Sequence, residues 1–157
     1  MPEAPSATLP SGPAAAARLV LAFDFGRRRI GVACGDTLSR TASPITTVRV
    51  GRESLPWDAI TDLMKDWQPA LAIVGLPYNV DGSENELAVA ARAFAGEIAR
   101  RYGLPVDLVD ERYSSLEASA RLREARALGV RTRRVAKADV DAAAAGVILE
   151  RWFLTTT

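Results

Sequence analysis

The chain has 157 residues, 48% of them apolar, which suits a single domain with a buried core, and its net charge of +1 says nothing about partners. It has no histidine and a single cysteine, Cys34. This composition excludes Ser-His-Asp and Cys-His catalysis, histidine general bases, thiolate metal sites and an internal disulfide. Chemistry must therefore come from carboxylates, hydroxyls, Lys, Arg or backbone groups, and carboxylates suit hard cations such as Mg²⁺ or Mn²⁺.

The first 17 residues differ in composition from the remainder of the chain. They are rich in Pro, Ala and Ser, and we expect a disordered tail over 1–17 and a single domain over 18–157. The start of the chain has no pattern of a signal peptide, and no apolar run reaches the length of a membrane span. Together with the lone cysteine, this predicts a cytoplasmic protein with no membrane partner.

The first part of the domain is predicted to be a meander of strands. LVLAFDF (19–25) is an apolar run of strand length, and IGVACG (30–35) follows a short turn, so the two predict a hairpin. The stretch 43–50 is rich in β-branched residues and predicts a third strand. Apolar residues at helical spacing over 53–67 then predict a helix that ends before Pro69.

The second part alternates strands with helices. ALAIVGL (70–76) is predicted to be a buried strand, and VDLVD (106–110) is predicted to be the fifth strand. Between them, Ser83 and Glu86 have the spacing of a capping box, which predicts a helix from Ser83 to about Gly103. The remaining predicted elements are a helix from Ser114 toward Leu128, a basic loop over 129–136 and a final helix over 139–153.

The order of these elements, βββαβαβαα, predicts an α/β fold. We expect a five-stranded mixed sheet, antiparallel at first and parallel afterwards, with helices on both faces. Right-handed crossovers are expected to bring the strands at 70–76 and 106–110 beside the strand at 19–25.

Basic residues are concentrated near the C-terminal third of the chain. The segment 121–137 contains seven Arg or Lys residues and one acid, so its net charge is +6 while the remainder carries −5. Such asymmetry is typical of a surface that binds phosphate groups. The alternative is a solvated helix face and loop, as most charge runs are.

Asp24 is a charged residue inside the most apolar predicted strand. A buried charge is costly unless it is paired or binds a metal. In open α/β sheets, ligands bind beyond the carboxyl ends of parallel strands, which is where Asp110 and Glu111 also lie. Consecutive strand residues point to opposite faces, so the pattern leaves open which of these two joins Asp24.

The last predicted helix supplies a third acid. Asp141 shares the apolar stripe of Ala144 and Ile148 and should face the sheet, whereas Asp139 lies about 200° around the axis. The alternative role of Asp141 is favourable placement at the positive helix end, worth ~0.3–1 kcal/mol. Gathered acids repel unless a cation neutralises them, so the three predict one or two divalent ions. Two ions ~3.5–4 Å apart can position a water nucleophile and the leaving oxygen of a phosphodiester.

Five stretches together resemble the YqgF family of ribonuclease H-like proteins, described as pre-16S rRNA nucleases and earlier as Holliday junction resolvases. They are FDFGRRRIGVACGD (23–36), SPI (43–45), IVGLPYNVDGSE (73–84), DERYSSLEA (110–118) and KADVDAAAAGVILERW (137–152). The resemblance covers about 19–153 and implies a ribonuclease H-like fold. It also implies an acidic catalytic and metal-binding site of Asp24, Glu111 and Asp141, and so selects Glu111. One departure is Tyr113-Ser114-Ser115, where the family commonly has Leu or Phe and two threonines.

The resemblance also implies a function. It is that of a hydrolase, a two-metal nuclease using Mg²⁺ or Mn²⁺, that cleaves structured RNA and processes the 5′ end of pre-16S rRNA in ribosome biogenesis. Its partners would be the precursor RNA and the ribosome. Two alternatives are a resolvase of four-way DNA junctions and a non-catalytic ribosome-assembly factor that binds nucleic acid, and the oligomeric state is open. The residues predicted to bind nucleic acid are Arg27, Arg28, Arg112, Arg131, Arg133, Arg134 and Lys137.

Overall fold

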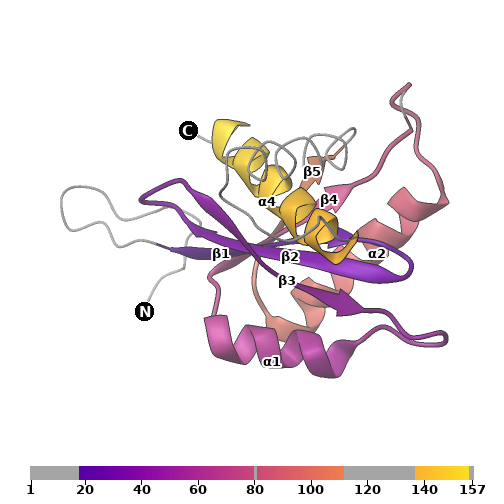
Figure 1. The fold of residues 1–157 in the computed structure, drawn as a ribbon, viewed down its shortest axis with the longest axis horizontal. Helices are drawn as coiled ribbons and strands as arrows, with labels where there is room; N and C mark the ends of the chain where they lie inside the picture. The colour runs from indigo at the N-terminus through magenta and orange to yellow at the C-terminus, as the bar shows by residue number, and fades with distance from the viewer. Residues whose placement is uncertain (1–17, 80, 112–136, 156–157) are drawn as a thin grey trace.

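The computed structural model describes residues 18–79, 81–111 and 137–155. Its centre is a five-stranded sheet in the order β3-β2-β1-β4-β5 (Figure 1). The strand β2 is antiparallel to β1 and β3, whereas β4 is parallel to both β1 and β5. The predicted mixed sheet is therefore confirmed, while the tail over 1–17 and the helix expected from Ser114 lie outside the described residues. The strands are β1 (Leu19–Phe25), β2 (Arg29–Asp36), β3 (Ala42–Arg49), β4 (Leu71–Leu76) and β5 (Val106–Asp110).

The position of β5 differs from the prediction. We expected both parallel strands to lie beside β1, but β4 separates β5 from β1 and β5 forms an edge of the sheet. One side of β1 is occupied by its hairpin partner β2, so only one further strand can pair with it. The crossover rule fixes the handedness of the connection and not the strand order.

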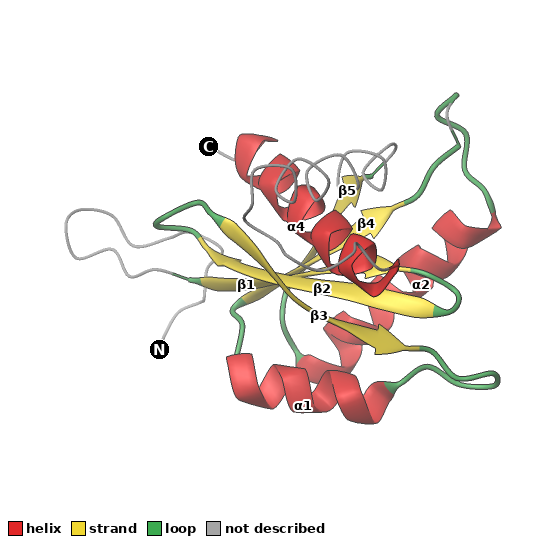
Figure 2. Ribbon diagram, viewed as in Figure 1, coloured by secondary structure: helices red, strands yellow, loops and turns green. Residues whose placement is uncertain are grey.

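Helices cover both faces of the sheet (Figure 2). The helices α1 (Trp57–Trp67) and α2 (Glu86–Tyr102) pack on one face, and α4 (Lys137–Thr155) packs on the other. Alternate residues of β1 pack into the hydrophobic cores on the two faces of the sheet, because successive strand side chains point to opposite faces. Leu21, Phe23 and Phe25 pack under α1 and α2, whereas Val20 and Ala22 pack under α4.

The first helix starts later than predicted. It begins at Trp57 rather than at residue 53, and Pro56 occupies the N-cap position. A proline disfavours helical conformation in the residue before it, so the apolar spacing continues outside the helix. No helix among the described residues is both long and apolar enough to span a bilayer.

The second helix has a different cap from the predicted one. It begins at Glu86, and the side chain of Asn85 accepts a hydrogen bond from the N–H of Ala88 at 2.8 Å. Ser83 lies in the preceding loop, where its hydroxyl donates to Asp81 at 2.6 Å. The predicted capping box is therefore wrong, since Asn is a cap as good as Ser and stands immediately before the helix.

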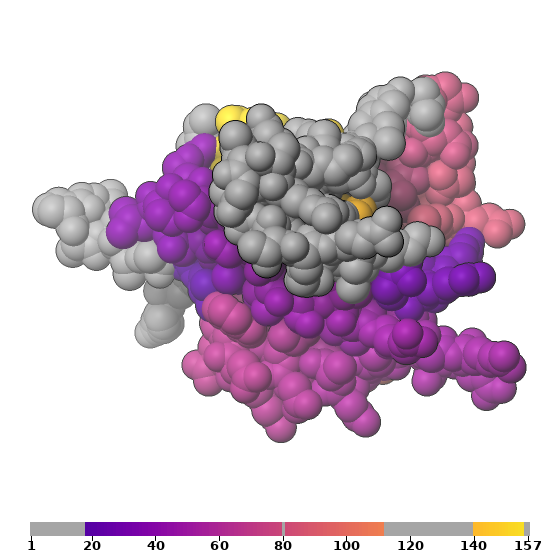
Figure 3. Space-filling model, in the orientation of Figure 1, coloured from indigo at the N-terminus to yellow at the C-terminus, as the bar shows by residue number. Residues whose placement is uncertain are grey.

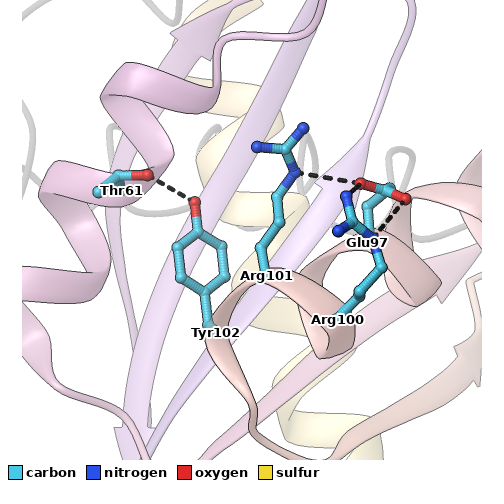
Figure 4. Close-up of polar contacts among 5 residues, drawn as sticks. All are labelled: Thr61, Glu97, Arg100, Arg101 and Tyr102. Carbon is cyan, nitrogen blue, oxygen red and sulfur yellow. Dashed lines mark hydrogen bonds and ion pairs between the residues drawn. The ribbon is translucent and has the colours of Figure 1, made fainter.

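One polar contact joins α1 to α2, and ion pairs lie along α2 itself (Figure 4). The hydroxyls of Thr61 and Tyr102 lie 2.7 Å apart, and Glu97 pairs with Arg100 at 2.6 Å and Arg101 at 3.1 Å. The ion pairs are on the surface, where solvent screens the charges, so they add little to the stability of the fold. In the space-filling view, α1 and the segments of β2 and β3 form a continuous surface (Figure 3).

Candidate active site

Asp24 is flanked on its own face of the sheet by two glycines. It pairs with Gly31 of β2, and the parallel register with β4 brings Gly75 to its other side. A Cβ on Gly31 would lie 1.9 Å from the backbone oxygen of Asp141, and one on Gly75 would lie 2.7 Å from Glu111 Oε2. The two missing side chains therefore make room for the two other acids beside Asp24.

Asp141 reaches the site because the start of α4 lies over the carboxyl end of β1 (Figure 1). Its backbone packs against Gly31, so it faces the sheet, as the helical stripe predicts. Its side chain is 22% exposed, and Oδ2 accepts a hydrogen bond from Nε of Arg29 at 2.5 Å. Asp141 is thus held in an ion pair, a contact that the sequence did not predict.

The side of β5 that faces α4 decides between Asp110 and Glu111. Val109 packs in the core under α4, and Asp107 accepts a hydrogen bond from Nε1 of Trp152 at 2.9 Å. Since strand side chains alternate, Glu111 continues this face and Asp110 points to the other one. The structure therefore brings Glu111, rather than Asp110, to the face of the sheet on which Asp24 lies.

Glu111 reaches Asp24 across the intervening strand β4. Its backbone N–H donates to the oxygen of Leu76 at 3.0 Å, and its side chain is 93% buried, with 7% of its surface exposed. Strands β5 and β1 are two strand spacings apart, about 10 Å. The carboxyl group of Glu111 passes over Gly75 and is hydrogen-bonded to Asp24. A long side chain at 111 and a missing one at 75 are both needed for this contact.

Burial dominates the electrostatics of Asp24. The pKa of its carboxyl is raised from 3.8 to about 6, because desolvation and, to a smaller extent, the negative charge of Asp141 raise it more than the hydrogen bond with Glu111 lowers it. The ionised form is therefore disfavoured relative to an exposed aspartate. A cation at this position would stabilise the ionised form.

The donor set fits a hard divalent cation, although it is not fully assembled as a metal site. Among the described residues, no three Asp, Glu or Cys side chains are arranged around one ion. The carboxylates of Asp24 and Glu111 are in contact and supply the oxygen ligands that Mg²⁺ and Mn²⁺ prefer. The carboxylate of Asp141 interacts electrostatically with Asp24 but is bonded to Arg29.

The predicted nucleic-acid contacts are only partly described. Arg27 and Arg28 are exposed at the hairpin turn that follows β1. Arg27 forms an ion pair with Glu86 at 3.5 Å and lines, with Arg52, a cavity of about 260 Å³. Lys137 is the first residue of α4, but its side chain is outside the described part of the structure. Also outside the described residues are Arg112, Arg131, Arg133 and Arg134.

Sequence reasoning missed three residues that shape the site. Glycines inside predicted strands mark close approach of other groups, and this signal was present at Gly31 and Gly75. The third residue is Arg29, whose partner Asp141 lies 112 positions away. No local pattern links residues so distant along the chain.

The fold places the chain in the ribonuclease H-like class of α/β proteins. A Thermus thermophilus RuvC in complex with a Holliday junction substrate has a TM-score of 0.54 at 18% identity, over 86% of this chain and 93% of that one. The yeast mitochondrial Holliday junction resolvase Ydc2 has a TM-score of 0.51 at 11% identity, over 85% of this chain and 77% of that one. At these identities, the likeness concerns the fold alone.

Sequence comparison then gives the family. The model described as "RuvX: Holliday junction resolvase" matches residues 18–155. A protein of Dechloromonas aromatica named "Putative pre-16S rRNA nuclease" is 46% identical over 85% of this chain and 89% of its own length. One of the same name from Pectobacterium carotovorum is 44% identical over 87% and 95%. The chain belongs to the RuvX/YqgF family.

Proposed function

We propose that this chain is a divalent-metal-dependent nuclease that hydrolyses phosphodiester bonds in structured RNA, with the 5′ region of precursor 16S rRNA as its substrate. The observation that supports the proposal is the contact between the carboxyl groups of Asp24 and Glu111, with Asp141 close enough for its charge to act on Asp24. Relatives that share 42–46% of their residues with the chain support the choice of RNA through their names. Precursor rRNA would place the reaction in the cytoplasm.

In this proposal, Asp24 and Glu111 hold Mg²⁺ or Mn²⁺, and Asp141 completes the acidic site. When bound, divalent ions would neutralise the charges of the acids and the phosphodiester and would activate water, and three carboxylates suit a site of two such ions. The burial of Glu111 keeps bulk water from its carboxyl group, and Gly31 and Gly75 keep all three acids close. The carboxylates would also set the pH range of metal binding and cleavage, because a proton on Asp24 competes with the cation.

The bound nucleic acid would be recognised by its backbone. The exposed Arg27 and Arg28 adjoin the end of β1 and can contact phosphates on the substrate. Arg112, Arg131, Arg133, Arg134 and Lys137 remain predictions for the same role. Because no base-reading module is evident in the sequence, selectivity would depend on the shape of the RNA.

A second candidate function is the resolution of four-way DNA junctions. It is favoured by the description of the matching family model. The same acidic site would serve both reactions, so the substrate separates them. A third possibility, binding without cleavage, needs no acidic site, and the three acids argue against it because they repel phosphate.

The test uses the purified full chain with precursor 16S rRNA and, separately, with a four-way DNA junction. Each substrate is incubated with Mg²⁺, with Mn²⁺ and with a chelator. The variant Asp24→Asn removes the central carboxylate, and Asp62→Asn, an exposed residue of α1, is the matched control. We expect cleavage of the RNA that needs the metal, is lost in Asp24→Asn and is kept in Asp62→Asn.

The other outcomes are equally clear. Cleavage of the DNA junction alone would replace the RNA substrate by the second candidate. Cutting that resists the chelator would refute the metal mechanism. Binding of RNA by all three proteins without any cleavage would make the chain an assembly factor.

A further inference from the structure

Arg29 forms an ion pair with one of the three acids. Its Nε donates to Asp141 Oδ2 at 2.5 Å, and the two side chains are only 30% and 22% exposed. Arg29 precedes Gly31 by two residues on β2, so its side chain is on the α4 face of the sheet. It is therefore on the same face as the contact between Asp24 and Glu111.

The backbone of Asp141 packs closely on β2 through a contact that does not involve the Arg29 side chain. It is fixed by close packing of the start of α4 on Gly31, where a Cβ would be 1.9 Å from Asp141 O and 2.9 Å from Ala142 N. The ion pair therefore contributes charge to the site rather than placing α4 over the sheet. Without Arg29, the carboxylate of Asp141 would face the other acids with its charge uncompensated by this guanidinium.

We propose that Arg29 is the resident counter-ion of the acidic site, which holds Asp141 in the metal-free protein and releases it when a divalent cation binds. This inference rests on the proposed function, because it assumes that the three acids bind metal. Arg29 and the metal then compete for one carboxylate. The guanidinium lowers the metal affinity of the site and protects the metal-free protein from the repulsion of its own acids.

The inference predicts an effect opposite to that of a simple structural contact. Loss of a partly buried, charge-assisted hydrogen bond to a competing group should raise metal affinity about tenfold. If Arg29 instead positioned Asp141 for the metal, its removal would weaken binding. The direction of the change therefore separates the two roles.

The experiment measures Mn²⁺ binding to the full chain at pH 7 by the electron paramagnetic resonance signal of the free ion. Arg29→Gln removes the counter-ion, and Arg52→Gln removes the same charge from an exposed residue beyond the end of β3. We expect a dissociation constant about tenfold lower than wild type for Arg29→Gln, and within about twofold for Arg52→Gln because exposed charges are screened. Equal or weaker binding by Arg29→Gln overturns the inference.

A measurement on the wild-type protein covers the case in which Arg29→Gln does not fold. The Nε–H resonance of Arg29 is followed by NMR during titration with Mg²⁺, and we expect it to move with the midpoint of metal binding. A resonance that stays unchanged while Mg²⁺ binds overturns the inference. If the wild type cleaves RNA with Mn²⁺ but Arg29→Gln binds no more tightly, only this inference fails; if the wild type binds no metal, the proposed function fails with it.

Discussion

The substitution Gly31→Ala tests whether close packing of α4 on β2 builds the site. The added Cβ would lie 1.9 Å from the backbone oxygen of Asp141, whereas ordinary contacts begin at 3.4 Å, so the start of α4 has to move by about 1.5 Å. The obstacle is backbone and cannot rotate away. Overpacking typically costs about 1–3 kcal/mol, and we expect about 3 kcal/mol here. For a chain of this size, Tm should fall by about 6–12 °C.

The assay is thermal unfolding followed by circular dichroism, with Gly96→Ala as the control. Gly96 is on the exposed side of α2, and nothing lies within 4 Å of its added Cβ. Alanine is a better helix former, so the control should gain about 0.5–1 kcal/mol. If Gly31→Ala melts within about 2 °C of the wild type, the close approach of α4 to β2 is not part of the fold. Loss of cleavage should accompany the loss of stability, because Asp141 moves with the helix.

Two further predictions concern the other parts of the site. In Asp24→Asn without metal, the free energy of unfolding should exceed that of the wild type by up to about 3 kcal/mol at pH 7, and the difference should vanish near pH 4. Urea unfolding at several pH values measures this difference. A difference that does not depend on pH would contradict the prediction. The sign follows because the pKa of Asp24 is raised to about 6, so the folded protein binds more protons and loses stability as the pH rises from about 4 to about 6. In Gly75→Ala, the added Cβ would lie 2.7 Å from Glu111 Oε2, so Mn²⁺ binding should weaken about tenfold. The loss of Tm should be smaller than in Gly31→Ala, because the obstacle is a side chain that can move and not a backbone. Unchanged Mn²⁺ affinity would refute the role of Gly75.

The sequence was sufficient for the features that depend on local periodicity. Apolar runs located the strands, and the stripe that includes Asp141 indicated which side of the last helix faces the sheet. The position of β5 was not predictable in this way, because strand order depends on which edges are already paired. The choice of Glu111 needed either a family resemblance or knowledge of the face on which Asp107 and Val109 lie.

The helix starts and the ion pair show two further limits. Several capping residues compete near the start of α2, and the pattern at Ser83 did not reveal that Asn85 is the cap. The contact between Arg29 and Asp141 joins the second strand to the last helix, so it depends on the completed fold. Long-range charge pairs leave no periodic pattern in a sequence, so the sequence did not indicate a role for Arg29 at the site.

The charges at the site explain why Asp24 can remain in a buried strand. When all are ionised, Asp24, Glu111, Asp141 and the guanidinium of Arg29 carry a formal net charge of −2, which one divalent cation would balance. Below about pH 6, a proton on Asp24 removes part of this charge instead. In the metal-free protein, Arg29 offsets Asp141, and a proton shared between the carboxyl groups of Asp24 and Glu111 makes their hydrogen bond possible. The buried aspartate is therefore tolerated in each state, and only a cation balances the charge with all three carboxylates ionised.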